Sequence, residues 1–394
     1  MVTTPPTNGH PGSLERMRAA NRRALVAVLA AEGPTSRAQL SRATGLSRTT
    51  VSNLVHAMIE AGQLVETPGR GTPYKGGSGR PPVLVTLAAP SGGVAGVDIG
   101  HRHLRVAIAD RSGQVLVEDD ASLDVDGHGE RTLRRAAAMV TSLLERSGLE
   151  RLHGLGMCVP APIDRRSAKI TSGILPGWRD LVPASVLEGL LGVPATVDND
   201  ANLGALAEVH HGAARGVSDL VYLKVASGLG AGIVLGGRLH RGATGIAGEI
   251  GHVQIREDGR VCRCGNRGCL ETEVAMPQLL ALLEPAYDEP LDAARVLALD
   301  ADGDAGVRRV LRDAGSTMGR ALADLCNSLN PELLVVGGPL GSAPSLLEGL
   351  RAAVDRYAQP NTAAAVRVVP GELGDRAEVR GALALALARV ASAE

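Results

Sequence analysis

The sequence predicts an α/β protein of two lobes, preceded by a small winged helix-turn-helix domain. A basic N-terminal segment holds short helical patterns separated by turn residues, and two later segments share one strand–turn–strand opening. At 44% hydrophobic and 21% charged, the 394 residues have a globular composition. We expect residues 1–20 to form a disordered tail, 21–90 the helix-turn-helix domain and 91–394 the two-lobed domain.

The composition favours a cytoplasmic protein. No uninterrupted apolar run reaches the length of roughly 18 residues that a membrane span needs. The N-terminal residues lack the basic flank and apolar stretch of a secretory signal. Three of the five cysteines cluster at metal-type spacing, while Cys158 and Cys326 stand alone, which fits a reducing compartment better than a disulfide framework.

Charge is distributed unevenly along the chain. Residues 1–90 hold ten basic and four acidic side chains, a net charge of +6, whereas the remaining residues hold 31 and 38, a net charge of −7. A small basic domain joined to a larger acidic one favours contact of the first with a polyanion.

Three helices are predicted in the basic domain. The first ends at the Gly-Pro pair of 33–34, and Ser36 followed by Gln39 is the capping-box signature that begins the second. Gly45 is the expected end of the second helix, and Ser47 is the expected cap of the third. A short helix, a glycine turn and a further helix make a helix-turn-helix.

The third helix has two faces of opposite character. Apolar residues at helical spacing form its buried stripe, which consists of Val51, Leu54, Val55, Met58 and Ile59. The other face carries side chains that can hydrogen-bond bases or phosphates, namely Arg48, Thr49, Thr50, Ser52, Asn53 and His56. We therefore expect this helix to contact DNA.

The segment after the third helix predicts a β-hairpin with a Gly-, Arg- and Lys-rich tip. Such a hairpin is a wing, and Arg70, Lys75 and Arg80 near its tip are expected to contact phosphate or the minor groove. DNA binding is favoured by all of these features together: the helix caps, the apolar stripe and polar face of the third helix, the wing, and the basic charge of the domain. The alternative is a three-helix scaffold or dimerisation module with a solvated face.

The larger domain begins with three short strands, rich in Val and Ile, at 94–120. A helical pattern follows at 130–148 and an apolar strand at 152–164. The strand–turn–strand opening recurs at 219–242, and 331–340 contains a further buried strand that ends in glycines. Two halves that open in the same way predict a duplicated fold with a cleft between its lobes.

Eight short motifs of the larger domain occur in the order typical of one protein family. They are GVDIG, PAPID, LPGW, VDNDANLGALAE, VASGLGAGIV, GIAGEIGH, CRCGNRGCLE and NPELLVVGGPL. In these motifs residues 92–394 resemble the ROK family, which joins sugar kinases to sugar-responsive transcription factors. The resemblance implies the actin-like, hexokinase-like ATPase fold with a sugar between the lobes. A winged helix-turn-helix ahead of this domain is similar to the repressor branch of the family.

The resemblance also implies sugar-binding residues. Asp200 of the "DND" triplet occupies the position of the general base in the kinases, and Asn199 is expected to bind sugar hydroxyls. Glu249 and Glu271 match the other sugar-binding carboxylates, and His252 matches a histidine that both holds zinc and touches the sugar. Carboxylates and amides suit a polyol, which offers many adjacent donors. The alternative role for Asp200 is to cap the helix that begins there.

The first phosphate loop departs from that of the kinases. Active members carry a loop like D-x-G-G-T, in which small residues let backbone amides and a hydroxyl approach ATP. Here Asp98 is followed by Ile-Gly-His-Arg-His, and the replacement of Gly-Thr by His101 and Arg102 adds bulk and removes the hydroxyl. We therefore expect no kinase activity. The alternatives are an active ATP-dependent sugar kinase with a fused DNA-binding domain, and an oligomerisation module that has lost sugar binding.

Cys262, Cys264 and Cys269, with His252 upstream, offer four ligands of the kind that Zn²⁺ prefers. Four protein ligands complete a tetrahedron and leave no position for water, so a structural metal is predicted in preference to a catalytic one. One alternative is a redox switch, which needs a thiol pair that is available to form and break a disulfide. The other is an incidental cluster.

These features predict a repressor of carbohydrate-related genes whose larger domain senses a sugar. Its expected partners are operator DNA and a sugar or sugar-derivative effector. We expect a homodimer or homotetramer, whose two-fold symmetry would match a palindromic operator. The segment SGILPGWRD around Trp178 is expected near the cleft. Glucose, xylose, an amino sugar and a phosphorylated sugar all remain candidates for the effector.

Overall fold

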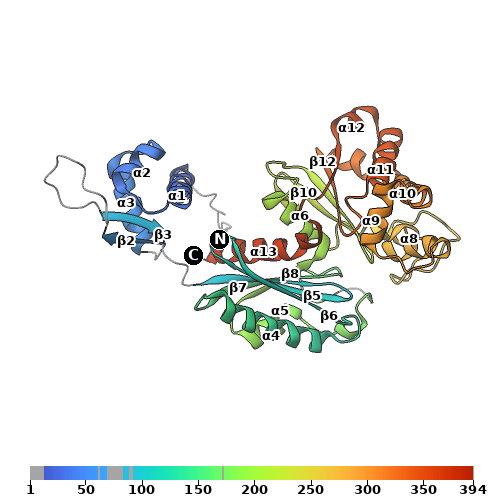
Figure 1. Cartoon of the computed structure of the whole chain (residues 1–394), viewed down its shortest axis with the longest axis horizontal. Coiled ribbons are helices and arrows are strands. Elements are labelled where there is room, and N and C mark those ends of the chain that lie inside the picture. Colours follow the sequence, from blue (N-terminus) through green and yellow to red (C-terminus); the bar gives the residue numbers. More distant parts are fainter. Residues whose placement is uncertain (1–12, 61–62, 69–82, 88–91, 171–172, 394) are drawn as a thin grey trace, which may run out of the picture. The chain divides into compact units, whose positions relative to one another are not determined.

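The computed structural model describes residues 13–60, 63–68, 83–87, 92–170 and 173–393. The chain divides into two compact units, one ending at Ser91 and the other beginning at Gly92 (Figure 1). This division falls one residue after the predicted boundary. Within the described ranges no helix has both the length and the apolar character that crossing a membrane requires.

The first unit holds three helices, α1 (Ser13–Glu32), α2 (Arg37–Thr44) and α3 (Arg48–Glu60). Helix α1 begins inside the predicted disordered tail, so that prediction is wrong for residues 13–20. The physical reason is local: this segment consists of Leu, Glu, Arg, Met, Ala and one Ser, and it contains no Gly or Pro that would interrupt a helix. The preceding residues, 1–12, lie outside the described part of the chain.

Both ends of α2 have the predicted caps. The Ser36 hydroxyl accepts a hydrogen bond from the Gln39 backbone N–H, and the Gln39 side chain accepts one from the Ser36 backbone N–H at 3.0 Å. At the other end Gly45 has a φ of 71°, the left-handed conformation that glycine adopts without strain. Ser47 caps α3, because its hydroxyl accepts a bond from the Thr50 backbone N–H at 3.1 Å.

Replacing Ser36 with alanine is expected to destabilise the first unit by about 1 kcal/mol, because both bonds of the capping box depend on the orientation of that residue. Hydrogen exchange of the α2 amides in the full-length protein measures the loss. The matched control is Thr49→Ala on the exposed face of α3, which should change exchange free energies by less than about 0.5 kcal/mol. Equal effects of the two variants would contradict the prediction.

A three-stranded sheet completes the first unit, in the order β1-β3-β2. Its strands are β1 (Thr35–Ser36), β2 (Leu64–Pro68) and β3 (Val83–Leu87). β2 and β3 pair antiparallel, which confirms the predicted hairpin, although Arg70, Lys75 and Arg80 lie outside the described residues. The predicted stripe of α3 faces the core of the unit, with Val51, Val55 and Met58 buried and Leu54 and Ile59 half-buried.

The first lobe of the larger unit is a five-stranded sheet in the order β6-β5-β4-β7-β8. Its strands are β4 (Gly93–Ile99), β5 (His103–Asp110), β6 (Val115–Ser122), β7 (Leu152–Val159) and β8 (Ala195–Asn199). The first three strands pair antiparallel, and β7 and β8 continue parallel to β4. One face of the sheet is covered by α4 (Gly129–Ser147), with α5 (Pro183–Leu191) beside it (Figure 1).

The second lobe repeats this topology in the order β11-β10-β9-β12-β13, which confirms the predicted duplication. Its strands are β9 (Leu220–Val225), β10 (Leu229–Leu235), β11 (Arg238–His240), β12 (Leu333–Gly337) and β13 (Arg367–Pro370). Its helices are α7 (Glu271–Val274), α8 (Met276–Leu283), α9 (Ala293–Asp302), α10 (Ala305–Leu329), α11 (Pro344–Tyr357) and α12 (Pro360–Ala365). Buried residues of α10 and α11 pack on one face of β9 and β12.

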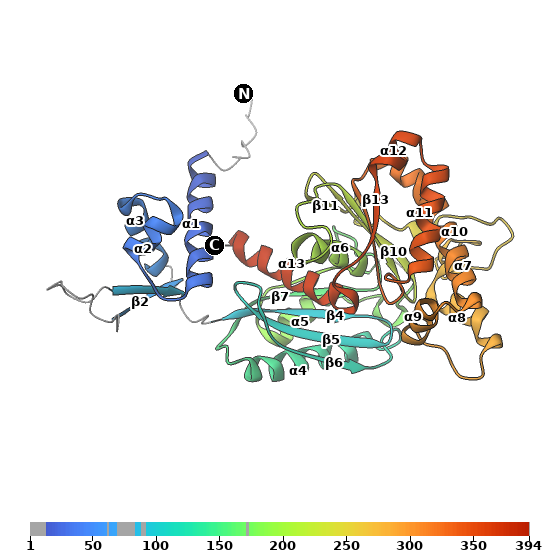
Figure 2. The ribbon, with the colours of Figure 1, turned by 45° about the horizontal axis from the view of Figure 1, so that its top comes forward.

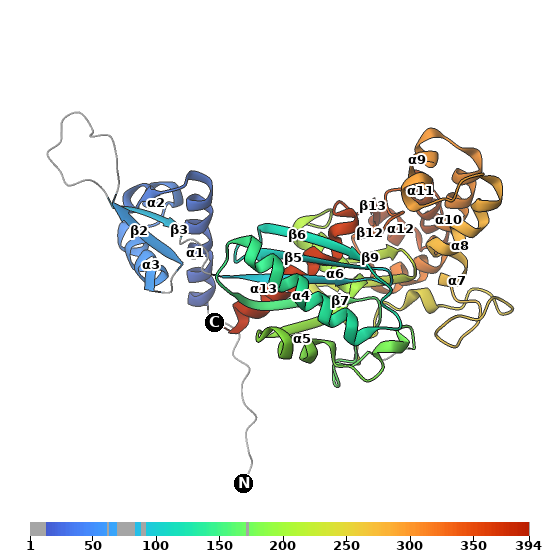
Figure 3. The same cartoon turned by 60° about the horizontal axis from the view of Figure 1, so that its bottom comes forward.

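Two helices join the lobes, α6 (Asp200–His211) and α13 (Ala377–Ala393) (Figures 2 and 3). Helix α6 packs on β9 and β10, whereas α13 packs on β4 and β7, and the two helices contact each other. Gly381 makes this contact close, because a Cβ at that position would overlap the Leu203 carbonyl oxygen. The lobes therefore meet through α6 and α13, and the first residues of α6 lie where the lobes face each other.

Candidate functional site

The predicted sugar residues line one small cavity of about 60 Å³ in the larger unit. Asn199 and Asp200 reach it from the junction of β8 and α6. Glu249 and His252 come from the loop around a short 3₁₀ turn, and Glu271 is the first residue of α7. The fold thus brings together residues from three distant parts of the sequence.

The start of α6 assigns different tasks to Asn199 and Asp200. Asn199 is the N-cap: its Oδ1 accepts from the backbone N–H of Ala201 at 2.9 Å and of Asn202 at 3.3 Å. The alternative cap role for Asp200 is therefore wrong, because Asp200 is the first helical residue. Asn199 keeps its side-chain NH₂ group as the donor that can meet a ligand oxygen.

Three carboxylates converge on the cavity from Asp200, Glu249 and Glu271. Burial, followed by the negative charges of Asp200 and Glu271, raises the pKa of Glu249 to about 7. Glu271 also accepts a hydrogen bond from the Leu229 backbone N–H at 3.4 Å. Hydroxyl donors of a ligand would offset the mutual repulsion of these carboxylates, so the cavity is chemically matched to a polyol.

Sequence reasoning missed three cationic or imidazole side chains that line the same cavity: His101, Lys224 and Arg263. Lys224 pairs with Asp200 (Nζ to Oδ2, 2.8 Å) and His101 pairs with Asp126 (Nδ1 to Oδ1, 2.6 Å). Lys224 had a detectable signal, since it interrupts the otherwise apolar strand β9. Arg263 and His101 lie in loops, where charged residues are common, and had no comparable signal.

The altered phosphate loop is filled by its own histidine. His103 lies over the backbone of Gly100, where a Cβ would overlap the imidazole ring. Its Nε2 also lies 3.0 Å from Oδ2 of the buried Asp98. The bulk was expected from His101 and Arg102, whereas the side chain that packs against the Gly100 backbone is that of His103.

The His103 pair predicts a pH dependence of stability. The hydrogen bond to Asp98 raises the pKa of His103, an effect opposed by burial and by the positive charges of Lys224 and Arg105. Because the folded pKa exceeds the unfolded one, the stabilisation is complete below about pH 6.5 and is lost as the pH rises through the raised value. His103 is half-exposed, so we expect less than about 1 kcal/mol.

Chemical unfolding of the full-length protein from about pH 6 to pH 9 tests this expectation. His103→Gln should remove part of the decline in unfolding free energy that the unmodified protein shows with rising pH. His128→Gln is the matched control, because His128 is exposed and makes no capping hydrogen bond. A variant at His103 with the unmodified pH profile would contradict the assignment.

The four predicted metal ligands lie together, with Nδ1 or Nε2 of His252 and the Sγ atoms of Cys262, Cys264 and Cys269 all within 4.8 Å of one another. Cys264 Sγ and Cys269 Sγ are 3.7 Å apart, and Cys262 Sγ lies 3.5 Å from Nδ1 of His252. A tetrahedron with a Zn–S distance of about 2.3 Å places sulfur ligands about 3.8 Å apart. The cluster can therefore hold a metal ion, and its dimensions fit zinc.

The metal cluster is continuous with the cavity. One ring nitrogen of His252, Nε2, lies 3.5 Å from Oε2 of Glu249, so a cavity carboxylate neighbours a candidate metal ligand. Cys269 precedes Glu271 by two positions, and it forms an isolated antiparallel β-bridge with Gln254. A metal held by these ligands would tie together the two segments that carry Glu249 and Glu271.

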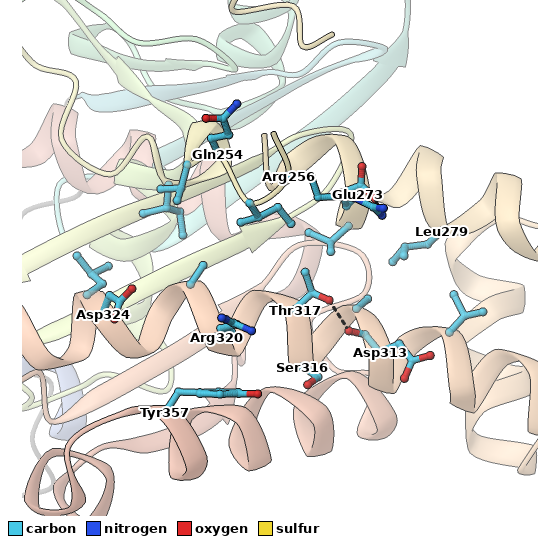
Figure 4. A pocket seen from close by; sticks show the side chains of 18 of the residues that line it. Gln254, Arg256, Glu273, Leu279, Asp313, Ser316, Thr317, Arg320, Asp324 and Tyr357 are labelled. Atoms are coloured by element: carbon cyan, nitrogen blue, oxygen red, sulfur yellow. Dashed lines mark hydrogen bonds and ion pairs between the residues drawn. The ribbon is translucent and has the colours of Figure 1, made fainter. Parts of the chain in front are cut away.

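A second and larger concavity, of about 1020 Å³, lies on the second lobe (Figure 4). It is an open groove along α10 that includes Asp313 and Arg320, with Tyr357 of α11 at one edge. None of the predicted sugar or metal residues lines it. Size alone would favour this groove, but the converging polar groups identify the small cavity as the candidate site.

The segment around Trp178 was expected near the cleft, but Trp178 itself is not part of either concavity. Its side chain is fully buried in the core of the first lobe, where its indole N–H donates to the Val125 carbonyl at 2.9 Å. The neighbouring Ile174 does line the small cavity. A large apolar ring with one donor is most stable in a core site that satisfies that donor.

The predicted DNA-facing residues of α3 lie outside the core of the first unit. Arg48, Thr49, Asn53 and His56 are exposed, whereas Thr50 and Ser52 are half-buried. The Thr50 hydroxyl lies 2.8 Å from the Ser47 hydroxyl, so part of its hydrogen-bonding capacity serves the helix cap. The remaining predicted contact, Arg80, falls outside the described residues.

Similar proteins include transcriptional repressors and sugar kinases. The xylose repressor of Caldicellulosiruptor bescii is 30% identical over 91% of this chain and 92% of its own length. The glucokinase of Halalkalibacterium halodurans is also 30% identical, over 73% of this chain and 92% of its own. A crystal structure of a ROK family transcriptional regulator, homologous to the Escherichia coli Mlc protein, matches 95% of this chain and 96% of its own at 25% identity, with a TM-score of 0.72.

Two family models match separate parts of the chain. The model described as the IclR helix-turn-helix domain matches residues 24–68, within the first unit. The model described as the ROK family matches residues 94–389, nearly the whole of the larger unit. The two-lobed fold, the cavity between its lobes and these matches lead to one conclusion: the chain belongs to the ROK family.

Proposed function

We propose that this protein is a sugar-responsive, DNA-binding transcriptional repressor of carbohydrate-related genes. One observation carries the proposal: Asn199, Asp200, Glu249 and Glu271 converge on one cavity in a chain that also has a helix-turn-helix unit with an exposed polar face. A sugar hydroxyl suits those groups, and a polar recognition helix suits DNA. The repressors among the similar proteins support the combination.

The effector is proposed to be a neutral sugar that binds in the small cavity. Xylose is the first candidate, because a relative that matches most of this chain is a xylose repressor. The cavity of about 60 Å³ is well below the roughly 300 Å³ of ordinary ligand pockets. Binding therefore requires that the lobes separate or that side chains move, and such a movement is what a sugar sensor needs.

The chain is proposed not to be a kinase. Asp200 stands where a general base would act, but its Oδ2 is already engaged by the Lys224 ammonium at 2.8 Å. His103 fills the first phosphate loop. A sugar kinase remains the second candidate function, because a glucokinase is among the similar proteins. Release of ADP from ATP with any of the sugars named below, absent in Asp200→Asn, would favour it.

The metal is proposed to be a structural Zn²⁺ held by His252, Cys262, Cys264 and Cys269, since four protein ligands leave no open coordination position. The partners are proposed to be operator DNA and the sugar, with the protein acting as a homodimer or homotetramer in the cytoplasm. Arg48, Thr49, Ser52 and Asn53 of α3 are proposed to contact bases or phosphates, with Thr50, His56 and Arg80 as further contacts.

A DNA-binding titration tests the proposed function. Duplex DNA is first selected by the full-length protein from a random pool, and its affinity is then measured with and without D-xylose, D-glucose, N-acetylglucosamine and glucose 6-phosphate. One sugar should weaken DNA binding by roughly 5- to 150-fold, the usual range of coupling between sites. Arg48→Ala should weaken DNA binding about tenfold without changing that ratio. An unchanged affinity with every sugar, despite calorimetric binding of one, would exclude the proposal.

A further inference from the structure

Lys224 is a buried cation at the junction of the lobes. It lies on β9, where successive side chains alternate between the two faces of the sheet. Val221 and Leu223 belong to the core shared with α10 and α11, whereas Leu220 and Tyr222 face α6, so Lys224 lies on the α6 side. Its side chain is only 12% exposed, and a buried ammonium is stable only when nearby carboxylates compensate the loss of hydration.

Two carboxylates from different lobes share the Lys224 ammonium. Nζ lies 2.8 Å from Oδ2 of Asp200, the first residue of α6, which packs on the second lobe. It also lies 3.0 Å from Oε1 of Glu378, the second residue of α13, which packs on the first lobe. Asp200 lines the sugar cavity and Glu378 does not. Lys224 therefore connects a cavity residue to a helix of the opposite lobe.

The environment keeps this ammonium charged. Burial by itself would lower the pKa of Lys224, but the negative charges of Asp200, Glu378 and Asp98 raise it well above its usual value. A buried cation that loses one partner must strengthen its contact with another or expose itself to water. A change in the hydrogen bonding of Asp200 therefore alters the pair between Lys224 and Glu378.

We propose that Lys224 is a positioning residue that transmits occupancy of the sugar cavity, through Glu378, to the contact between the lobes. This inference rests on the proposed sugar response. A sugar hydroxyl that donates to Asp200 draws negative charge away from Lys224, and Lys224 then pairs more fully with Glu378. The first turn of α13 consequently moves relative to α6, where Gly381 already allows the two helices to touch. The empty and occupied cavities thus favour different relative positions of the lobes.

Glu378→Gln is the sharpest test, because it removes the negative charge of one partner of Lys224 without touching the cavity. The sugar is the one of the four named above that changes the DNA affinity of the unmodified protein most. The expected result is that the ratio of DNA affinities without and with this sugar falls to within about twofold of one. The sugar should still bind the variant in calorimetry, because all the predicted sugar-binding side chains remain.

The matched control is Asp300→Asn, which neutralises another buried carboxylate in the second lobe, one that accepts from the Ser345 backbone N–H at 3.1 Å. This variant should keep the sugar-dependent ratio of the unmodified protein. A Glu378→Gln protein with the full ratio would overturn the inference while leaving the proposed function intact. An unmodified protein that binds a sugar but shows no ratio would instead remove the proposed function, and the inference with it.

A second measurement requires no variant. Hydrogen exchange of the unmodified protein is compared with and without the same sugar, for the amides in the first turns of α13 and of α11. The inference predicts a change in protection of the first turn of α13, and no change at α11, whose first turn begins at Pro344 away from Lys224. Equal protection of α13 in both states would overturn it.

Discussion

Replacing Cys269 with serine is expected to abolish metal binding and to lower the melting temperature by about 5–15 °C. Cys269 is fully buried and its Sγ lies 3.7 Å from that of Cys264, so the loss of one thiolate opens a tetrahedron that has no spare ligand. The segments that carry Glu249 and Glu271 would then lose their shared anchor. Sugar affinity is expected to fall when the metal is lost. Metal content by mass spectrometry, thermal unfolding and calorimetry measure the three effects.

Cys326→Ala is the matched control for this prediction. Cys326 is also buried, in α10, but it lies outside the metal cluster. The control should keep the metal and the sugar affinity, and lose only the packing contribution of one sulfur atom. A Cys269→Ser protein that retains one equivalent of zinc and binds sugar normally would show that the cluster is not the anchor of the cavity.

Asp200→Asn is expected to weaken sugar binding by about 10- to 100-fold, because hydrogen bonds to a charged acceptor contribute about 1.5–3 kcal/mol. The carboxylate lies in the cavity with Oδ1 on the Ala201 backbone N–H and Oδ2 on Lys224. An amide keeps the shape of the side chain but lacks the negative charge that strengthens a hydrogen bond from a sugar hydroxyl. Because the variant also removes the Asp200 charge from Lys224, DNA affinity without sugar should shift toward the value that the unmodified protein has with sugar, and isothermal calorimetry combined with the DNA titration separates the two effects.

Asp313→Asn provides the control for Asp200, since Asp313 lines the larger groove along α10 (Figure 4). If the sugar binds in the small cavity, this variant should match the unmodified protein in sugar affinity. The reverse pattern, with a loss at Asp313 and none at Asp200, would place the ligand in the groove and exclude the cavity as the sugar site.

Local patterns predicted much of this molecule. Ser36, Gln39 and Gly45 defined both ends of α2 because caps act within a few residues of the chain. The four metal ligands were predicted for a similar reason, since three of them lie within one short turn. The start of α1 was misplaced because helix propensity alone is a weak signal, and the residues that precede Ser13 have no helical pattern.

The sugar cavity was predicted only in part. Its carboxylates and Asn199 were identified through a family resemblance, and the family is confirmed. The exchange of cap roles between Asn199 and Asp200 depends on where the helix begins, to within one residue, which sequence patterns do not resolve. The segment around Trp178 was expected near the cleft, and Ile174 of that segment lines the cavity, whereas the Trp178 indole N–H is satisfied inside the core.

By itself, the sequence determined the two-part organisation, the helix-turn-helix and the clustering of four candidate metal ligands, because each depends on periodicity or spacing within a short segment. Only the tertiary structure decided that His103 covers Gly100, and that Lys224 lies between Asp200 and Glu378. The Lys224 pairs join residues from β9, α6 and α13, and their energy depends on burial and on distances of about 3 Å. Such quantities exist only after the chain has brought both lobes together.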